Sequence, residues 1–140
     1  RQLLSDVRSA VSDLKELNLV SQVAQLKQRL LEQDFNITFN VELSVLPAKV
    51  EGIASLIIKE SVTNLLRHSS TKNSAITIKQ TSQQLLIEVI DNAPCGRLEA
   101  GNGLNGIKER AEQIQGSATF TCGEQFTLNV VLPISSEDLQ

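Results

Sequence analysis

The sequence contains no methionine, tryptophan or tyrosine, and only four phenylalanines, two cysteines and one histidine. So few aromatic rings leave little on which nucleic-acid bases could stack, and a net charge of −3 does not favour a basic binding face. We therefore expect no nucleic-acid partner. Two cysteines and one histidine provide neither a disulfide framework nor a zinc-binding pattern, so a reducing, cytoplasmic setting is the simplest expectation.

Long apolar runs are absent as well. No stretch approaches the roughly 18 apolar residues of a membrane-spanning helix, and no secretory signal pattern is found. The lack of methionine and the start at Arg1 lead us to expect a piece of a longer protein, so missing signals say little about the parent. With 140 residues, of which 41% are hydrophobic and 21% charged, the chain fits one folded domain.

The hydrophobic spacing predicts four helices and five strands. The helices are expected at 1–17, 19–32, 48–68 and 104–115, and the strands at 37–43, 75–80, 85–90, 118–122 and 126–132. The first helix carries an apolar seam that a lone helix cannot bury, so we expect it to need a partner helix. Because the strands mostly follow one another in pairs, we expect an α/β (α+β) fold with a mixed, largely antiparallel sheet and helices on one face.

The helix at 48–68 brings four polar side chains together. At about 100° per residue, they fall within roughly a third of a turn. They are Glu60, Asn64, Arg67 and His68. Carboxylate and amide oxygens suit Mg²⁺, and a guanidinium suits phosphate oxygens. The alternative is the solvated face of an ordinary amphipathic helix, which is the commoner origin of such a pattern taken alone.

Two further stretches favour phosphate binding. Gly101, Gly103 and Gly106 lead into a predicted helix, where free backbone N–H groups and the helix dipole attract anions. This loop is neither a Walker loop nor a dinucleotide fingerprint, because it lacks Gly-Lys-Ser/Thr and a surrounding parallel strand–loop–helix unit. The other stretch is Asp91-Asn92 at a strand end. A flexible linker and a plain turn are the respective alternatives.

The order of these motifs resembles a known family. They are Glu60-x-x-x-Asn64-x-x-Arg67-His68-Ser69, then Asp91-Asn92, then Gly101-x-Gly103-Leu104-x-Gly106-Ile107-x-Glu109-Arg110. Nearly the whole chain resembles the ATP-binding catalytic domain of sensor histidine kinases, within the GHKL superfamily, and most closely the subfamily whose response regulators carry helix-turn-helix output domains. The resemblance implies a two-layer α/β sandwich. It assigns 1–17 to the end of a dimerisation helix, 18–134 to the catalytic domain and 135–140 to a flexible tail.

The resemblance also implies a role for each motif residue in binding ATP and Mg²⁺. Glu60 would orient or deprotonate a Mg²⁺-bound water or the attacking group, and Asn64 would coordinate Mg²⁺, so these two form the implied metal site. Arg67 and His68 would contact phosphate or ribose, and Asp91 would accept a hydrogen bond from the adenine amino group. The other implied nucleotide-binding positions are Asn92, Gly101, Gly103, Leu104 and Gly106, with the glycines forming a lid hinge and the phosphate-facing start of a helix.

The function that the resemblance implies is transfer of the ATP γ-phosphoryl group to a histidine upstream of Arg1, followed by relay to a response regulator. The parent would be a homodimer joined through its dimerisation and phosphoacceptor helices. This domain would lie in the cytoplasm, and whether the parent is anchored in the inner membrane stays open. The chain alone would not phosphorylate itself, because its one histidine, His68, belongs to the implied pocket face.

The sequence departs from the family pattern at two places. Ala93 and Cys95 replace the glycines of Asp-x-Gly-x-Gly, and Gln125-Phe126 replace a Gly-Thr pair before the last strand. The first departure favours an alternative, a degenerate non-catalytic module of the same superfamily that regulates or binds partners. Another alternative is a serine kinase acting on anti-sigma systems, but the apolar seam at 1–17 favours the sensor kinase.

Overall fold

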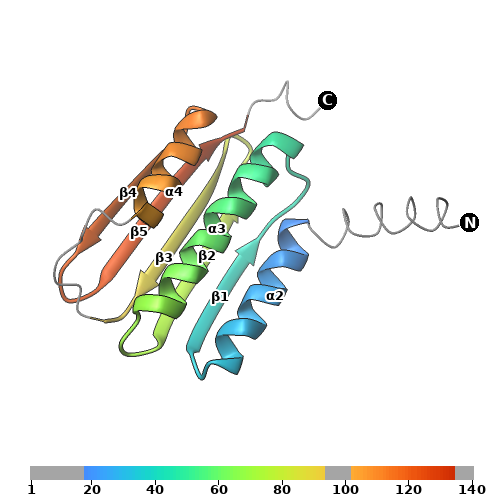
Figure 1. The fold of residues 1–140 in the computed structure, drawn as a ribbon. Coiled ribbons are helices and arrows are strands. Elements are labelled where there is room, and N and C mark those ends of the chain that lie inside the picture. Colours follow the sequence, from blue (N-terminus) through green and yellow to red (C-terminus); the bar gives the residue numbers. More distant parts are fainter. Residues whose placement is uncertain (1–17, 94–101, 135–140) are drawn as a thin grey trace, which may run out of the picture.

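The computed structural model describes residues 18–93 and 102–134 (Figure 1). Its elements are α2 (Leu19–Glu32), β1 (Asn36–Glu42), α3 (Ala48–His68), β2 (Asn73–Gln80), β3 (Gln84–Asp91), α4 (Asn102–Gln113), β4 (Ser117–Cys122) and β5 (Phe126–Pro133). Each of these elements was predicted from the sequence to within about two residues. The predicted helix at 1–17 and the tail at 135–140 lie outside the described residues.

The five strands form one sheet in the order β1-β2-β3-β5-β4. β1 pairs with β2 in parallel, and the other three neighbouring pairs are antiparallel. The three described helices cover one face of this sheet (Figure 1). The two-layer α/β sandwich with a mixed, mostly antiparallel sheet is therefore confirmed.

The core lies between the helices and the sheet. Alternate residues of β3 are buried, as expected for a strand with one covered face. Helix α3 lies across the middle of the sheet (Figure 1), and its Ile57, Ile58 and Val62 have no exposed surface. Polar bonds join α2 to α3, since the backbone N–H of Leu19 donates to Glu51 at 3.2 Å. Within the described part of the chain, no helix combines the length and apolarity needed to cross a membrane.

Helix α4 ends two residues earlier than predicted. Gln115 adopts a left-handed conformation with φ 64°, and the N–H of Gly116 donates to the carbonyl of Ala111 at 2.8 Å. A Cβ atom at Gly116 would collide with the backbone oxygen of Val131 in β5. Gly116 is thus required by close approach of helix end and strand, while Gln115 makes the turn.

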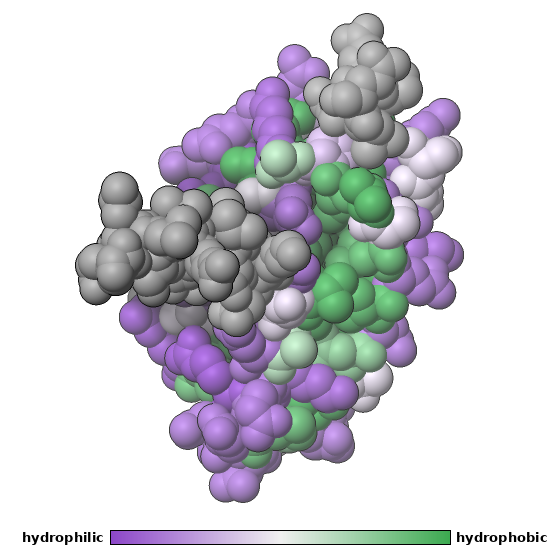
Figure 2. Space-filling model, turned by 90° about the vertical axis from the view of Figure 1, so that its right-hand side faces the viewer, coloured by the Kyte–Doolittle hydropathy of each residue, from purple (hydrophilic) through white to green (hydrophobic). Residues whose placement is uncertain are grey.

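The edge of the sandwich formed by β1 and α2 exposes apolar surface. Figure 2 views the molecule from this edge and shows apolar side chains gathered along it. Val45 is 81% exposed, Val20 58% and Val41 37%. This apolar edge contrasts with the polar surface that surrounds it in the same view.

Candidate functional site

The four polar residues predicted on the third helix do share one stretch of α3. Glu60 and Asn64 are half-buried, whereas Arg67 and His68 are exposed. Ser61 belongs to the buried stripe of the same helix. By helical geometry, Glu60 and Asn64 therefore lie at the border of the core rather than in the middle of a solvated face. This border is where a ligand held between helix and solvent could reach them.

The oxygens of Glu60 and Asn64 fit a magnesium ion in kind. The two residues are four positions apart on α3, so their side chains are neighbours on the helix surface. Magnesium usually takes only one or two protein ligands and keeps waters or binds substrate phosphates at its other positions. Among the described residues no cluster of three or more His, Cys, Asp or Glu side chains could hold a metal on its own. A metal at this pair would thus depend on a phosphate-bearing ligand.

Asp91 ends β3 on the helix-covered face, and only 9% of it is exposed. Its Oδ1 accepts a hydrogen bond from the Ser69 hydroxyl at 2.7 Å, and the same hydroxyl accepts from the N–H of Lys72 at 3.1 Å. Burial raises the pKa of Asp91, while the hydroxyls of Ser69 and Ser74 act in the opposite direction. The bonds from Lys72 to Ser69 and from Ser69 to Asp91 therefore engage Oδ1 of Asp91.

Asp91 lies in a row of three residues on adjacent strands. Ser74 of β2 and Phe126 of β5 both pair directly with Asp91, so all three side chains point to the same face of the sheet. Ser74 is 4% exposed, and its Oγ makes no hydrogen bond with a described residue. Phe126 is half-buried and stacks against Phe120, with ring centroids 6.4 Å apart. We call Ser74, Asp91 and Phe126 the polar-end row.

The structure joins the first two sequence motifs directly. Ser69, which follows Arg67-His68, contacts Asp91 as described, and Thr71 Oγ1 donates to the carbonyl of Asn92 at 2.9 Å. The N–H of Asn92 in turn donates to the carbonyl of Asn73 at 2.8 Å. Ser69 belongs to a sequence motif, whereas no sequence pattern singles out Ser74, because the importance of Ser74 depends on its strand partner.

The third motif is described from Asn102 onward, and Gly101 lies outside the described residues. Gly103 falls in the first turn of α4, and α4 packs against α3. Leu104 is partly buried against the hydrophobic core. A Cβ atom at Gly106 would meet nothing within 4 Å. Packing therefore does not explain the glycine at 106, whereas access for a ligand would.

Cys122, at the end of β4, is disulfide-bonded. The expectation of reduced cysteines is therefore wrong for this residue. The count and sequence spacing of cysteines could not show this, because spacing along the chain does not determine distance in the fold. Cys122 pairs in register with Phe126, so the bridge is anchored beside the polar-end row.

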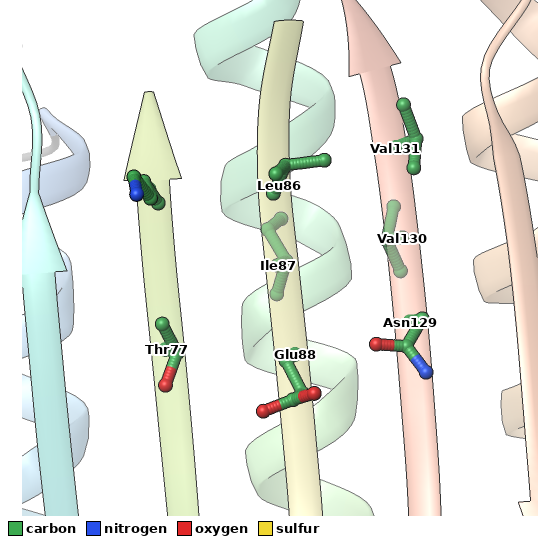
Figure 3. A pocket seen from close by; sticks show the side chains of 8 residues that line it. Thr77, Leu86, Ile87, Glu88, Asn129, Val130 and Val131 are labelled. Atoms are coloured by element: carbon green, nitrogen blue, oxygen red, sulfur yellow. The ribbon is translucent and has the colours of Figure 1, made fainter. Parts of the chain in front are cut away.

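A hollow of about 230 Å³ lies elsewhere, on the sheet face away from the helices (Figure 3). It is lined by Thr77, Lys79, Leu86, Ile87, Glu88, Asn129, Val130 and Val131. None of the predicted site residues lines it. The helices lie behind the strands in this view, so the hollow and the polar-end row occupy opposite faces. We therefore place the candidate site on the helix-covered face.

The chain resembles bacterial sensor kinases along almost its whole length. It is 31% identical over 140 residues to sensor histidine kinase YvfT of Bacillus subtilis, covering 96% of this chain and 37% of YvfT. It is 30% identical over 145 residues to sensor histidine kinase DesK of the same organism, covering 98% of this chain and 39% of DesK. The chain thus spans little more than a third of the length of these relatives. No family model matches the chain.

Solved structures share the fold at low sequence identity. The catalytic domain of histidine kinase ThkA matches with a TM-score of 0.66 and 11% identity, covering 84% of this chain and 94% of that domain. The histidine kinase domain of a blue-light activated kinase from Erythrobacter litoralis EL346 matches with a TM-score of 0.67 and 15% identity, covering 83% and 59%. The fold is therefore that of a histidine kinase catalytic domain. Together with the sequence similarity, it shows that the chain belongs to the family of sensor histidine kinases that includes YvfT and DesK.

Proposed function

We propose that this chain binds Mg·ATP and delivers the γ-phosphoryl group to a histidine of a sensor kinase. The observation that carries the proposal is Asp91, a buried carboxylate oriented by Ser69 at 2.7 Å. A carboxylate kept in an apolar layer, with its pKa raised by burial, is a frequent mark of a functional site. The amino group of adenine is a hydrogen-bond donor that suits such an acceptor.

The phosphate end of the ligand would meet α3 and the start of α4. Glu60 and Asn64 would hold Mg²⁺, which neutralises charge on the phosphates during phosphoryl transfer. Arg67 and His68, which are exposed at the end of α3, would contact phosphate or ribose. The start of α4 offers backbone N–H groups to phosphate, and the open surface at Gly106 supports close approach. Asn92, Gly101, Gly103 and Leu104 remain predicted nucleotide-binding positions.

Replacing Asp91 by asparagine tests base recognition. Asn retains the side chain's size but removes the charged acceptor, so we expect Mg·ATP affinity to fall by about 10- to 150-fold, the effect of losing one charge-assisted hydrogen bond. Calorimetric titration of the 140-residue chain measures this, with the exposed substitution Glu112→Gln as the control for lost charge. Equal affinity of wild type and Asp91→Asn would contradict the assignment.

Transfer to an upstream histidine is tested by incubation with γ-labelled ATP. We expect the 140-residue chain to remain unlabelled, because its one histidine, His68, would lie in the nucleotide site. A longer chain with the upstream helix should acquire an acid-labile, base-stable label. Labelling of the 140-residue chain that His68→Ala abolishes would instead make His68 the acceptor, and the proposed role of α3 would be wrong.

A non-catalytic module is the second candidate function. It is favoured by Ala93, which is 4% exposed and follows Asp91-Asn92 where the family has a glycine. Failure of the longer chain to become labelled, with nucleotide binding intact, would support this candidate. In the catalytic case, the partners would be a response regulator with a helix-turn-helix output domain and a second copy of the parent, joined through helices that include 1–17.

A further inference from the structure

Ser74 carries a buried hydroxyl that acts on Asp91 closely enough to lower the pKa of that carboxyl, but completes no hydrogen bond of good geometry with a described residue. The residue is 4% exposed, and its Oγ makes no hydrogen bond with a described residue. Buried polar groups in folded proteins nearly always have partners, because an unmade hydrogen bond destabilises the folded state. An alanine at this position would avoid that cost. Within the described chain the Ser74 hydroxyl acts on the Asp91 carboxylate, and a ligand bound beside Asp91 would complete its hydrogen bonding.

A second buried serine in this chain shows how a buried hydroxyl is ordinarily paired within the protein. Ser61 of α3 is 3% exposed, and its hydroxyl donates to the carbonyl of Ile57 at 2.8 Å. Serine in a helix can reach the preceding turn in this way. Ser74 stands in β2, where pairing with the neighbouring strands engages the backbone. Its hydroxyl is left facing the same layer as Asp91.

The neighbours of Ser74 determine what kind of ligand it could bind. Asp91 lies directly opposite Ser74 across the β2–β3 pair. The Ser69 hydroxyl occupies Oδ1 of Asp91, and the N–H of Lys72 directs the Ser69 proton toward that oxygen. Asp91 and Ser74 thus present an acceptor and a rotatable hydroxyl side by side. Phe126 follows in the same row and offers an apolar ring next to them.

We propose that Ser74 is a specificity-determining residue that donates a hydrogen bond to the ring nitrogen N1 of adenine, beside the amino group whose N–H donates to Asp91. This inference rests on the proposed function. Adenine presents a donor and an acceptor in adjacent positions, which match Asp91 and Ser74 in turn. Guanine would place its carbonyl oxygen against the Asp91 carboxylate. The pair would therefore select adenine over guanine, since a site built around hydrogen bonds rejects a ligand that leaves them unmade.

The test is a double-mutant cycle that combines a change of Ser74 with a change of the adenine N1 atom. Affinities are measured by calorimetry on the 140-residue chain. The probes are Mg·ATP and Mg·1-deaza-ATP, in which a carbon replaces N1. We expect Ser74→Ala to weaken ATP binding by about 3- to 10-fold, the effect of one neutral hydrogen bond, and to leave 1-deaza-ATP binding unchanged. Ser61→Ala is the matched control, a buried serine whose hydroxyl is bonded within its own helix, and should alter neither affinity.

A stability measurement separates this role from a structural one. Ser74→Ala should unfold at close to the denaturant concentration of wild type, because the hydroxyl completes no hydrogen bond of good geometry within the described chain. Ser74→Cys, which replaces the hydroxyl with a somewhat larger and weaker donor, should give a smaller loss of ATP affinity. Equal losses for ATP and 1-deaza-ATP, or no loss for ATP, would overturn the role of Ser74 while leaving the proposed function standing. Absence of ATP binding by the folded wild type would instead overturn the proposed function.

Discussion

Two rows of the same sheet, both under the helices, differ sharply in character. One is the polar-end row. The other, which we call the apolar row, is formed by Ile78, Ile87 and Val130. Each member of the apolar row is at most 1% exposed. The two rows share β2, β3 and β5, so strand identity does not explain why one row is apolar and the other is not.

The difference indicates what each row does. Burying an isoleucine stabilises the fold by about 1.5–3 kcal/mol, whereas an unpaired buried hydroxyl destabilises it by about 1–3 kcal/mol. Asp91 is also desolvated, which raises its pKa. A row that weakens the fold where an apolar row was possible is expected where a ligand binds. The apolar row holds the sandwich together, and the polar-end row belongs to the candidate site.

The largest expected effect is on stability in the apolar row. Ile87→Ala removes a side chain that is 1% exposed and leaves a cavity, so we expect the free energy of unfolding to fall by about 2–5 kcal/mol. Urea denaturation measures this loss. Nucleotide affinity of the folded fraction should remain unchanged. A variant that loses affinity but not stability would break the distinction between the rows.

A smaller effect is expected at the border of the core. Asn64→Ala should weaken nucleotide binding in Mg²⁺ by about 10-fold, the effect of one ligand bond, and much less in EDTA. The free energy of unfolding should stay the same or rise by about 0.5 kcal/mol, because alanine is the better helix former. Titrations with and without Mg²⁺ measure the contrast. Equal losses in both conditions would show that Asn64 does not bind the metal.

The smallest effect is the pH dependence of stability that arises from Asp91. Its pKa in the folded state lies above the ordinary 3.8, so folding favours the protonated form. This contribution to stability is present below pH 3.8 and is lost as the pH rises through the folded-state pKa. Asp91→Asn cannot lose a proton, so its stability relative to wild type should increase as the pH rises from 3.8 toward neutrality. Urea denaturation across this range would contradict the prediction if the difference were constant.

Most of the element boundaries could be predicted because they follow local periodicity. The third helix was predicted at 48–68 and is observed as Ala48–His68. The first strand was predicted at 37–43 but is observed one residue earlier, as Asn36–Glu42, because its bounds are set by pairing with β2, from Asn36 opposite Asn73 to Glu42 opposite Lys79. The motif order likewise indicates the family. The spacing of Glu60 and Asn64 on one helix predicted their proximity correctly.

The sequence by itself thus determined the helices and strands, the fold class and the family, because each depends on patterns within short segments. Only the tertiary structure decided that Ser74, Asp91 and Phe126 share a row, since their pairing depends on the register between strands distant in sequence. It also decided that Cys122 is bridged and that Ser69 orients Asp91. The physical reason is that periodicity reports which face of an element is buried, whereas contacts between elements are set by how the whole sheet assembles.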